Sequence, residues 1–367
     1  SSLSRGMPGP KDLPQNFLEI LQKIWWRLDR ALDDETIYYS TLAGAIDAAL
    51  CGTTTLIDHH ASPKAIKGSL DIIKEAMQQV GLRGVLCYEV TDRGGMKERD
   101  AGFEENERCI RANKNNSHFQ GMIGAHASFT LSSESLRLCG ELAAKYKTGV
   151  HIHVAEGMCD VVDAAENYGG SVVDRLSQHK ILKKESILAH CIHLAPADFR
   201  IFHNTQCWLV HNPRSNMNNN VGHAPVHLFG DRAALGTDGF PADMFEEART
   251  GFLKIQDSGS KAQGVDLTKF LQGGQELASE IFGVTFGTLT NDSVADLVVT
   301  DYQPPTSMTK ENLQGHFLFG MRSSMVESVM VGGKWVVKDR EVQGVDVTSI
   351  VEKSRKVATK LWERMNR

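Results

Sequence analysis

The sequence has little that would mark a secreted or membrane-bound protein. Its seven cysteines are odd in number, lie scattered along the chain and never form a Cys-x-x-Cys pair, which predicts reduced thiols in the cytoplasm. No apolar run reaches the roughly 18 residues that a membrane span needs, and residues 1–15 lack the apolar centre of a signal peptide. We therefore expect a cytoplasmic protein with no membrane partner.

Surplus positive charge is also missing. The 40 Lys and Arg residues are outnumbered by 45 Asp and Glu residues, which gives a net charge of −5 and a sequence pI of about 6.3. No basic field is therefore present to gather the phosphates of a nucleic acid or of an anionic lipid. We expect a small-molecule partner and no nucleic acid, and the sequence leaves a homo-oligomer open.

What the sequence does have is an alternation of short apolar runs with longer amphipathic stretches, which is typical of parallel strands joined by helices. Seven candidate strands cover residues 53–60, 83–90, 121–127, 149–155, 186–191, 207–211 and 233–238. Helical patterns occur at residues 69–80, 132–146, 161–179 and 242–256, and two helix-like segments, 16–32 and 36–50, precede the first strand. The pattern predicts an α/β fold, a (β/α)8 TIM-type barrel with the first strand missing from this chain.

The C-terminal quarter does not continue the barrel pattern. Residues 267–282 have a further helical pattern, residues 294–302 and 325–337 alternate like strands, and Gly332-Gly333 is typical of a hairpin turn. A charged amphipathic helix is expected at residues 347–365. We predict a barrel portion at residues 1–290, a small β appendage at residues 291–345 and a C-terminal helix at residues 346–367.

Polar residues gather where the predicted strands end, and in such barrels those ends form the mouth of the active site. The histidines and aspartates at these ends are Asp58, His59, His60, His126, His151, His153, His190, His211 and Asp238. Any one of them could be a hydrogen-bonded structural residue. Together they indicate a metal site, because histidine, carboxylate and an open position are what catalytic zinc or iron requires.

Two carboxylates at these ends are candidates for proton transfer. Glu156 follows His153 by three residues, so it can share a site with that histidine and move protons without binding the metal, as a conserved Glu does in zinc deaminases. A solvated Glu at a helix start is the alternative. Asp238 follows an apolar strand and precedes Gly239, which points its carboxylate into the mouth, although a helix N-cap would look the same.

Six segments, in this order, resemble the amidohydrolase superfamily, in the branch of the cytosine, guanine and S-adenosylhomocysteine deaminases and the chlorohydrolases. They are Gly52-Thr53-Thr54-Thr55, Ala125-His126, His153-x-x-Glu156, residues 189–194, residues 211–216 and residues 235–239. Within the branch, residues 5–10, 25–26 and 58–63 look most like the SsnA-type aminohydrolases.

The resemblance implies a role for several positions. His153 and Asp238 match metal ligands, and Glu156 matches the proton shuttle. His190 matches the histidine that contacts the activated water and the reacting group of the substrate. The substrate-contacting positions are matched by His126, Asn212 and Asn216. The implied cofactor is one divalent metal ion, with zinc as the first choice and iron as the alternative.

One departure from the family affects the metal site. The family takes two further ligands from a His-x-His at the end of strand one, whereas no His-x-His precedes His151 in this sequence. The missing first strand and the two missing metal ligands belong to the same part of the family fold. We therefore expect these two histidines upstream of Ser1. We predict a metal-dependent aminohydrolase that hydrolyses a C–N bond of a small heterocyclic substrate, with Asp238 as the base and Glu156 as the acid. Chloride release or amide hydrolysis could use the same residues, and the sequence does not separate them from ammonia release. The alternative of a different class is an inactive scaffold that keeps the barrel without those ligands.

Overall fold

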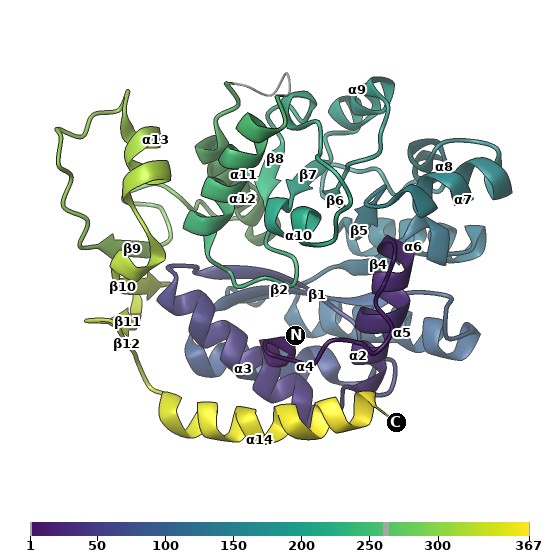
Figure 1. Cartoon of the computed structure of the whole chain (residues 1–367), viewed down its shortest axis with the longest axis horizontal. Coiled ribbons are helices and arrows are strands. Elements are labelled where there is room, and N and C mark those ends of the chain that lie inside the picture. The colour runs from purple at the N-terminus through teal and green to yellow at the C-terminus, as the bar shows by residue number, and fades with distance from the viewer. Residues whose placement is uncertain (1, 260–263, 367) are drawn as a thin grey trace.

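The computed structural model describes residues 2–259 and 264–366, and a curled parallel sheet forms its centre (Figure 1). Hydrogen-bonded neighbours in this sheet follow the order β1 (Thr55–His60), β2 (Arg83–Val90), β4 (Ile123–Ala127), β5 (Val150–Val154), β6 (Ile187–His190), β7 (Trp208–His211) and β8 (Ala233–Leu235). A short strand, β3 (Phe119–Gly121), pairs with β2 ahead of β4. The seven strands on this path confirm the prediction.

The sheet is a half-barrel. Among the described residues, β1 and β8 are its two edges and do not pair with each other, which is where the sequence places the missing strand. All eight residues of β2 are buried, as expected for a parallel strand covered on both faces.

Helices surround the sheet. They include α3 (Asp34–Leu50), α4 (Ser69–Val80), α5 (Met96–Asn113), α6 (Ser133–Tyr146), α7 (Met158–Tyr168), α8 (Val172–Gln178), α9 (Pro196–Thr205), α10 (Pro213–Asn218), α11 (Met244–Asp257) and α12 (Leu267–Phe282), with 3-10 turns η3 (Ser128–Thr130) and η4 (Val226–Leu228) between them. No helix in residues 2–259 or 264–366 is both long and apolar enough to cross a bilayer.

The prediction of a single helix at residues 161–179 is wrong, because the chain turns between α7 and α8. Gly169 ends α7 with φ 69°, a left-handed conformation that glycine adopts without strain. Ser171 then starts α8 with a capping box, in which its side chain accepts from the backbone N–H of Asp174 and the Asp174 side chain accepts from the backbone N–H of Ser171.

The N-terminal segment is helical through residues 17–31, as predicted, but it is not uniform. A π-helical turn, η2 (Leu21–Trp25), joins α1 (Phe17–Ile20) to α2 (Trp26–Ala31), and a 3-10 turn, η1 (Ser2–Ser4), precedes them. Such π turns widen a helix and recur at functional sites. Phe17 and Leu21 of this segment line the pocket described below.

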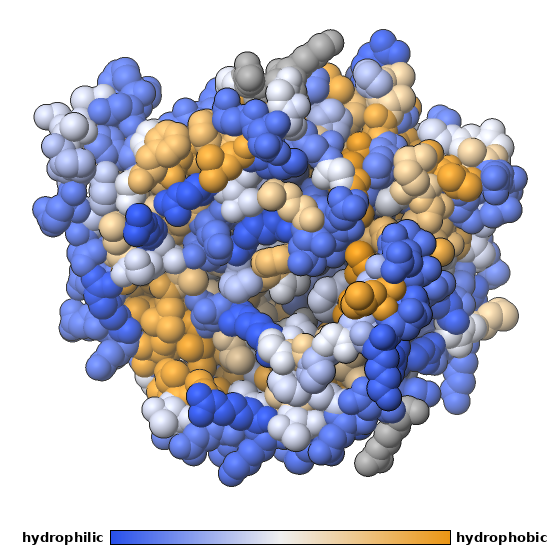
Figure 2. All heavy atoms as spheres, viewed as in Figure 1, coloured by the Kyte–Doolittle hydropathy of each residue, from blue (hydrophilic) through white to orange (hydrophobic). Residues whose placement is uncertain are grey.

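A small antiparallel sheet stands beside the half-barrel, in the order β12 (Glu341–Val342), β11 (Lys334–Lys338), β10 (Val326–Val331) and β9 (Leu297–Thr300). Gly332 and Gly333 both have positive φ and connect β10 to β11 as the predicted hairpin. The connection from β9 to β10 contains α13 (Leu313–Gly315), η5 (His316–Gly320) and η6 (Ser323–Met325). Figure 2 shows a mostly hydrophilic face, with an apolar patch next to this sheet.

The C-terminal helix α14 (Val347–Met365) runs along one side of the molecule, against α2 and α3 (Figure 1). Trp362 Nε1 donates to the carbonyl oxygen of Leu3 at 2.9 Å, and Arg364 Nε donates to that of Ala31 at 2.8 Å. Apolar residues near both ends of the described chain, such as Leu3 and Leu361, also belong to the same core cluster. All seven cysteines are free thiols.

Candidate metal and catalytic centre

The carboxyl ends of β5, β6 and β8 bring together the three residues predicted to be catalytic. His190 Nε2 lies 3.4 Å from Glu156 Oε2 and 4.0 Å from Asp238 Oδ2. One ligand-type atom from each residue lies within 4.8 Å of those of the other two. The three residues that the sequence predicted to be catalytic therefore lie together in the fold.

The backbone is strained where these side chains enter the mouth. Ala155, His190 and Asp238 have φ of 47°, 72° and 48°, in the left-handed region that residues with a Cβ seldom occupy. Such conformations cost of order 1–3 kcal/mol each and concentrate at functional sites. The strain therefore supports a functional role for this edge of the sheet.

The two carboxyl groups of the centre differ in their affinity for protons. Burial, followed by the charge of Asp238, raises the pKa of Glu156 to about 8. Burial opposes the ionisation of Asp238 too, but His190 and the hydrogen bond from Ser215 bring its pKa below the ordinary value. These opposite shifts favour a protonated Glu156 and an ionised Asp238 near neutral pH, which is the pairing that acid–base catalysis needs.

Two imidazole rings of the centre are held by their Nδ1 atoms. His153 Nδ1 lies 2.8 Å from the carbonyl oxygen of His126, and His190 Nδ1 lies 2.7 Å from Asn216 Oδ1. Both oxygens accept a hydrogen bond, so each ring keeps a lone pair on Nε2. Metal-binding histidines are oriented in this way.

The predicted metal ligands, His153 and Asp238, fit a divalent ion by their chemistry but fall in different clusters. Asp238 groups with Glu156 and His190, whereas His153 groups with His59 and Glu89. The charge of His153 nevertheless contributes to the lowered pKa of Asp238. The assignment of these two residues as a ligand pair stays a prediction.

A hydrogen-bonded bridge that the sequence did not indicate joins the acid to the base. Asn219 Nδ2 donates to Glu156 Oε1 at 3.2 Å and approaches Ser215 Oγ at 3.4 Å, and Ser215 Oγ donates to Asp238 Oδ2 at 2.5 Å. Residues 215 and 219 lie on and just beyond α10, one helical turn apart. That spacing was the only signal in the sequence.

The predicted substrate contacts lie in two different environments. His126 lines the pocket, with Nδ1 2.6 Å from Thr130 Oγ1. Asn212 and Asn216 are 4% and 2% exposed, and Asn216 is engaged by His190. A substrate contact for these two asparagines stays a prediction.

Apolar side chains line one wall of the pocket. Phe17, Leu21 and Phe129 lie beside His153 and Glu156. A Cβ on Gly157 would overlap the Phe17 ring, so glycine lets the helical segment approach the centre. An apolar wall facing acid–base groups suits a flat, partly polar ligand.

Asp160, at the start of α7, ties two loops of the centre together. Its carboxylate accepts from the backbone N–H of Ala155 at 2.8 Å and from that of Phe129 at 2.9 Å. The side chain is buried, with 2% of the residue exposed. It therefore fixes the loop between His153 and Glu156 against the loop after β4.

A parallel half-barrel with histidines and carboxylates at its strand ends defines a metal-dependent hydrolase of the TIM-barrel class. The chain belongs to the amidohydrolase family, whose sequence profile matches residues 7–336. It is 30% identical over 373 residues to a 5-methylthioadenosine/S-adenosylhomocysteine deaminase of Thermoanaerobacter pseudethanolicus, an alignment that covers 96% of this chain and 82% of that protein. A 5'-deoxyadenosine deaminase of Methanocaldococcus jannaschii is 27% identical over 356 residues, with 94% and 82% covered.

Solved structures share the fold. An adenosine deaminase from Xanthomonas campestris with bound zinc superposes with a TM-score of 0.85 at 21% identity, covering 98% of this chain and 83% of that one. An atrazine chlorohydrolase from Arthrobacter aurescens complexed with zinc has a TM-score of 0.80 at 16% identity, with 97% and 85% covered. These likenesses confirm the predicted barrel type. None of these relatives is of the SsnA type, so that finer placement stays a prediction.

Proposed function

We propose that the chain is a metal-dependent aminohydrolase that releases ammonia from an aminated heterocycle, with adenine nucleosides as the first substrate class to test. The observation that carries the proposal is the pairing of a protonated Glu156 with an ionised Asp238 on either side of His190. The names of the relatives, which are deaminases of adenosine-like compounds, support the substrate class.

His153 and Asp238 would hold the divalent ion, with zinc as the first choice because a structural relative binds it. When bound, the ion supplies a water molecule acidic enough to attack carbon near neutral pH. The described residues provide an oriented imidazole and an ionised carboxylate for this purpose.

The protons have defined positions on the protein. Asp238 takes up the proton that water loses, since its lowered pKa keeps it ionised. Glu156 carries the proton needed by the leaving nitrogen, and its carboxyl faces His190 Nε2 at 3.4 Å. Because burial lowers the pKa of His190, its ring begins neutral. The proton of Glu156 therefore stays available for the leaving nitrogen, and the role proposed for His190 is to contact the reacting group of the substrate.

The wall of the pocket selects the shape of the ligand. Phe17 and Phe129 offer apolar surface next to Glu156, which suits contact with one face of a planar ring whose exocyclic amine points toward the acid. Asn219 holds one oxygen of Glu156, which leaves Oε2 for the reacting group. A cytoplasmic location and a homo-oligomer remain predictions.

An ammonia-release assay over a panel of adenine nucleosides tests the proposal. We expect turnover of at least one member, and Asp238→Asn should abolish it because the base is lost. His227→Asn is the matched control, since His227 is exposed and away from the centre. Absence of ammonia from the whole panel, or unchanged turnover in Asp238→Asn, would contradict the proposal.

A further inference from the structure

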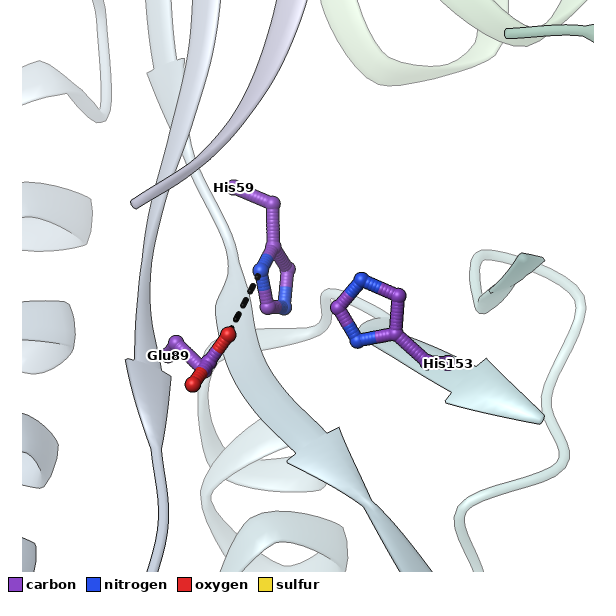
Figure 3. A group of neighbouring side chains, drawn as sticks. All are labelled: His59, Glu89 and His153. Carbon is purple, nitrogen blue, oxygen red and sulfur yellow. Dashed lines mark ion pairs between the residues drawn. The ribbon is translucent and has the colours of Figure 1, made fainter. Parts of the chain in front are cut away.

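A second group of metal-type side chains lies at the ends of β1, β2 and β5. His59, Glu89 and His153 each offer one ligand atom within 4.8 Å of the others. His59 Nδ1 lies 3.7 Å from Glu89 Oε2. Figure 3 shows the His59 ring between the Glu89 carboxylate and the His153 ring, with the ion pair from His59 to Glu89 drawn as a dashed line.

Backbone carbonyls fix which nitrogen of each ring keeps a lone pair. His59 Nε2 lies 3.1 Å from the carbonyl oxygen of Ala125, and His153 Nδ1 lies 2.8 Å from that of His126. A carbonyl oxygen only accepts, so these nitrogens carry the protons. His59 Nδ1 and His153 Nε2 are then left with lone pairs, which is how metal-binding imidazoles are prepared.

The carboxylate is prepared in the same way. Arg93 Nη2 donates to Glu89 Oε1 at 2.5 Å, which orients the group and leaves Oε2 toward His59. The Arg93 guanidinium in turn lies over the Trp26 ring, 4.4 Å from its centroid. Metal-binding carboxylates commonly have such a partner on their second oxygen.

The spacing suits an ion. Ligands about 2.1 Å from a tetrahedral metal lie about 3.4 Å from each other, close to the 3.7 Å between His59 Nδ1 and Glu89 Oε2.

We propose that His59 Nδ1, Glu89 Oε2 and His153 Nε2 form a binding site for a divalent transition-metal ion, which shares His153 with the proposed catalytic metal site but uses none of Glu156, His190 and Asp238. Two imidazoles and one carboxylate suit zinc, cobalt or iron(II) rather than magnesium or calcium. His153 has one free nitrogen, so an ion here and an ion held through Asp238 compete for it. The proposal of this site rests on the positions of these three side chains. It does not require that the protein be a deaminase.

The experiment is a titration of chelator-stripped protein with Co²⁺, followed by visible absorption and checked by equilibrium dialysis with Zn²⁺. We expect the parent chain and Asp238→Asn to bind the ion. His59→Asn and Glu89→Gln should each weaken binding by at least about 10-fold, the lower range for perturbed metal sites. His60→Asn is the matched control, because the ring of His60 bonds to Ser62 Oγ instead.

The design separates this site from the catalytic one. Glu89→Gln keeps an oxygen for Arg93 and so preserves the packing, and adding it to Asp238→Asn should remove the binding that remains. No binding by the parent, parent-like affinity in both His59→Asn and Glu89→Gln, or complete loss in Asp238→Asn alone would each overturn the site. Failure of ammonia release with cobalt binding intact would count against the proposed function alone.

Discussion

Asn219 Nδ2 donates a hydrogen bond of 3.2 Å to Glu156 Oε1, so the residue that ends α10 holds the proposed acid in the loop after β5. Asn219 is 6% exposed, and its hydrogen bond opposes the effect of burial on the pKa of Glu156. The orientation of Glu156 therefore depends on an element that is distant in the sequence.

Replacing Asn219 with alanine should lower turnover more than substrate affinity. The lost hydrogen bond is worth about 0.5–1.5 kcal/mol, which corresponds to a fall in kcat of about 2- to 10-fold with KM nearly unchanged. Steady-state kinetics on Asn219→Ala, with the exposed Met217→Ala as control, check this. An equal rise in KM with constant kcat would show that Asn219 binds substrate instead.

Glu156→Gln should keep its metal and lose its rate. A proton shuttle contributes roughly 10²-fold or more to turnover, whereas a metal ligand would lose metal and activity together. Metal analysis and kinetics on the same preparation distinguish the two. Turnover within a few-fold of the parent would mean that Glu156 is not the acid.

Asp160→Ala should destabilise the chain. Removing the carboxylate leaves the backbone N–H groups of Ala155 and Phe129 buried without their partner, at about 1–3 kcal/mol for each group. Urea unfolding should show a loss of at least about 2 kcal/mol, by the same estimate. Glu166→Ala, an exposed change on the same helix, is expected to be neutral. Equal stability of the two variants would contradict the role given to Asp160.

Glu280 should make stability depend on acid pH. Hydrogen bonds from Arg232, opposed in part by burial and aided by Trp208, lower the pKa of Glu280 to about 2 from an ordinary value of 4.5. A depressed pKa stabilises the fold above the ordinary value, and this contribution is lost as the pH falls from about 4.5 toward about 2.

Unfolding of Glu280→Gln at pH 7 and pH 3 tests this dependence. The variant should be less stable than the parent at pH 7, and the difference should shrink at pH 3. Glu276→Gln, on the same helix, is the control, because Glu276 accepts a hydrogen bond from the neutral Gln272 side chain. A constant difference across both pH values would exclude the ion pair as its cause.

Much of the fold followed from the sequence because parallel strands carry a local signal. The run that became β2 is largely apolar and fully buried, and β5 alternates buried aliphatic residues with half-buried histidines. The end of α14 was predicted at the residue where it stops. The break at Gly169 was missed because the apolar period continues across it. The division of the chain at residues 290 and 345 stays a prediction.

The site was predictable only where function and sequence pattern coincide. Glu156, His190 and Asp238 were found because each ends a strand and matches a family motif. Glu89 also lies at a strand end, yet no motif pointed to it. Asn219 could not be predicted, because its contact with Glu156 spans 63 residues and arises only when two loops meet.

The contacts of α14 have a consequence for how the protein is made. Leu3 and Ala31 bond to side chains at positions 362 and 364, and the core cluster they belong to contains apolar residues from both ends of the described chain. A chain leaving the ribosome folds its N-terminal part first. The apolar surface that α14 covers on α2 and α3 therefore stays exposed until translation has delivered α14.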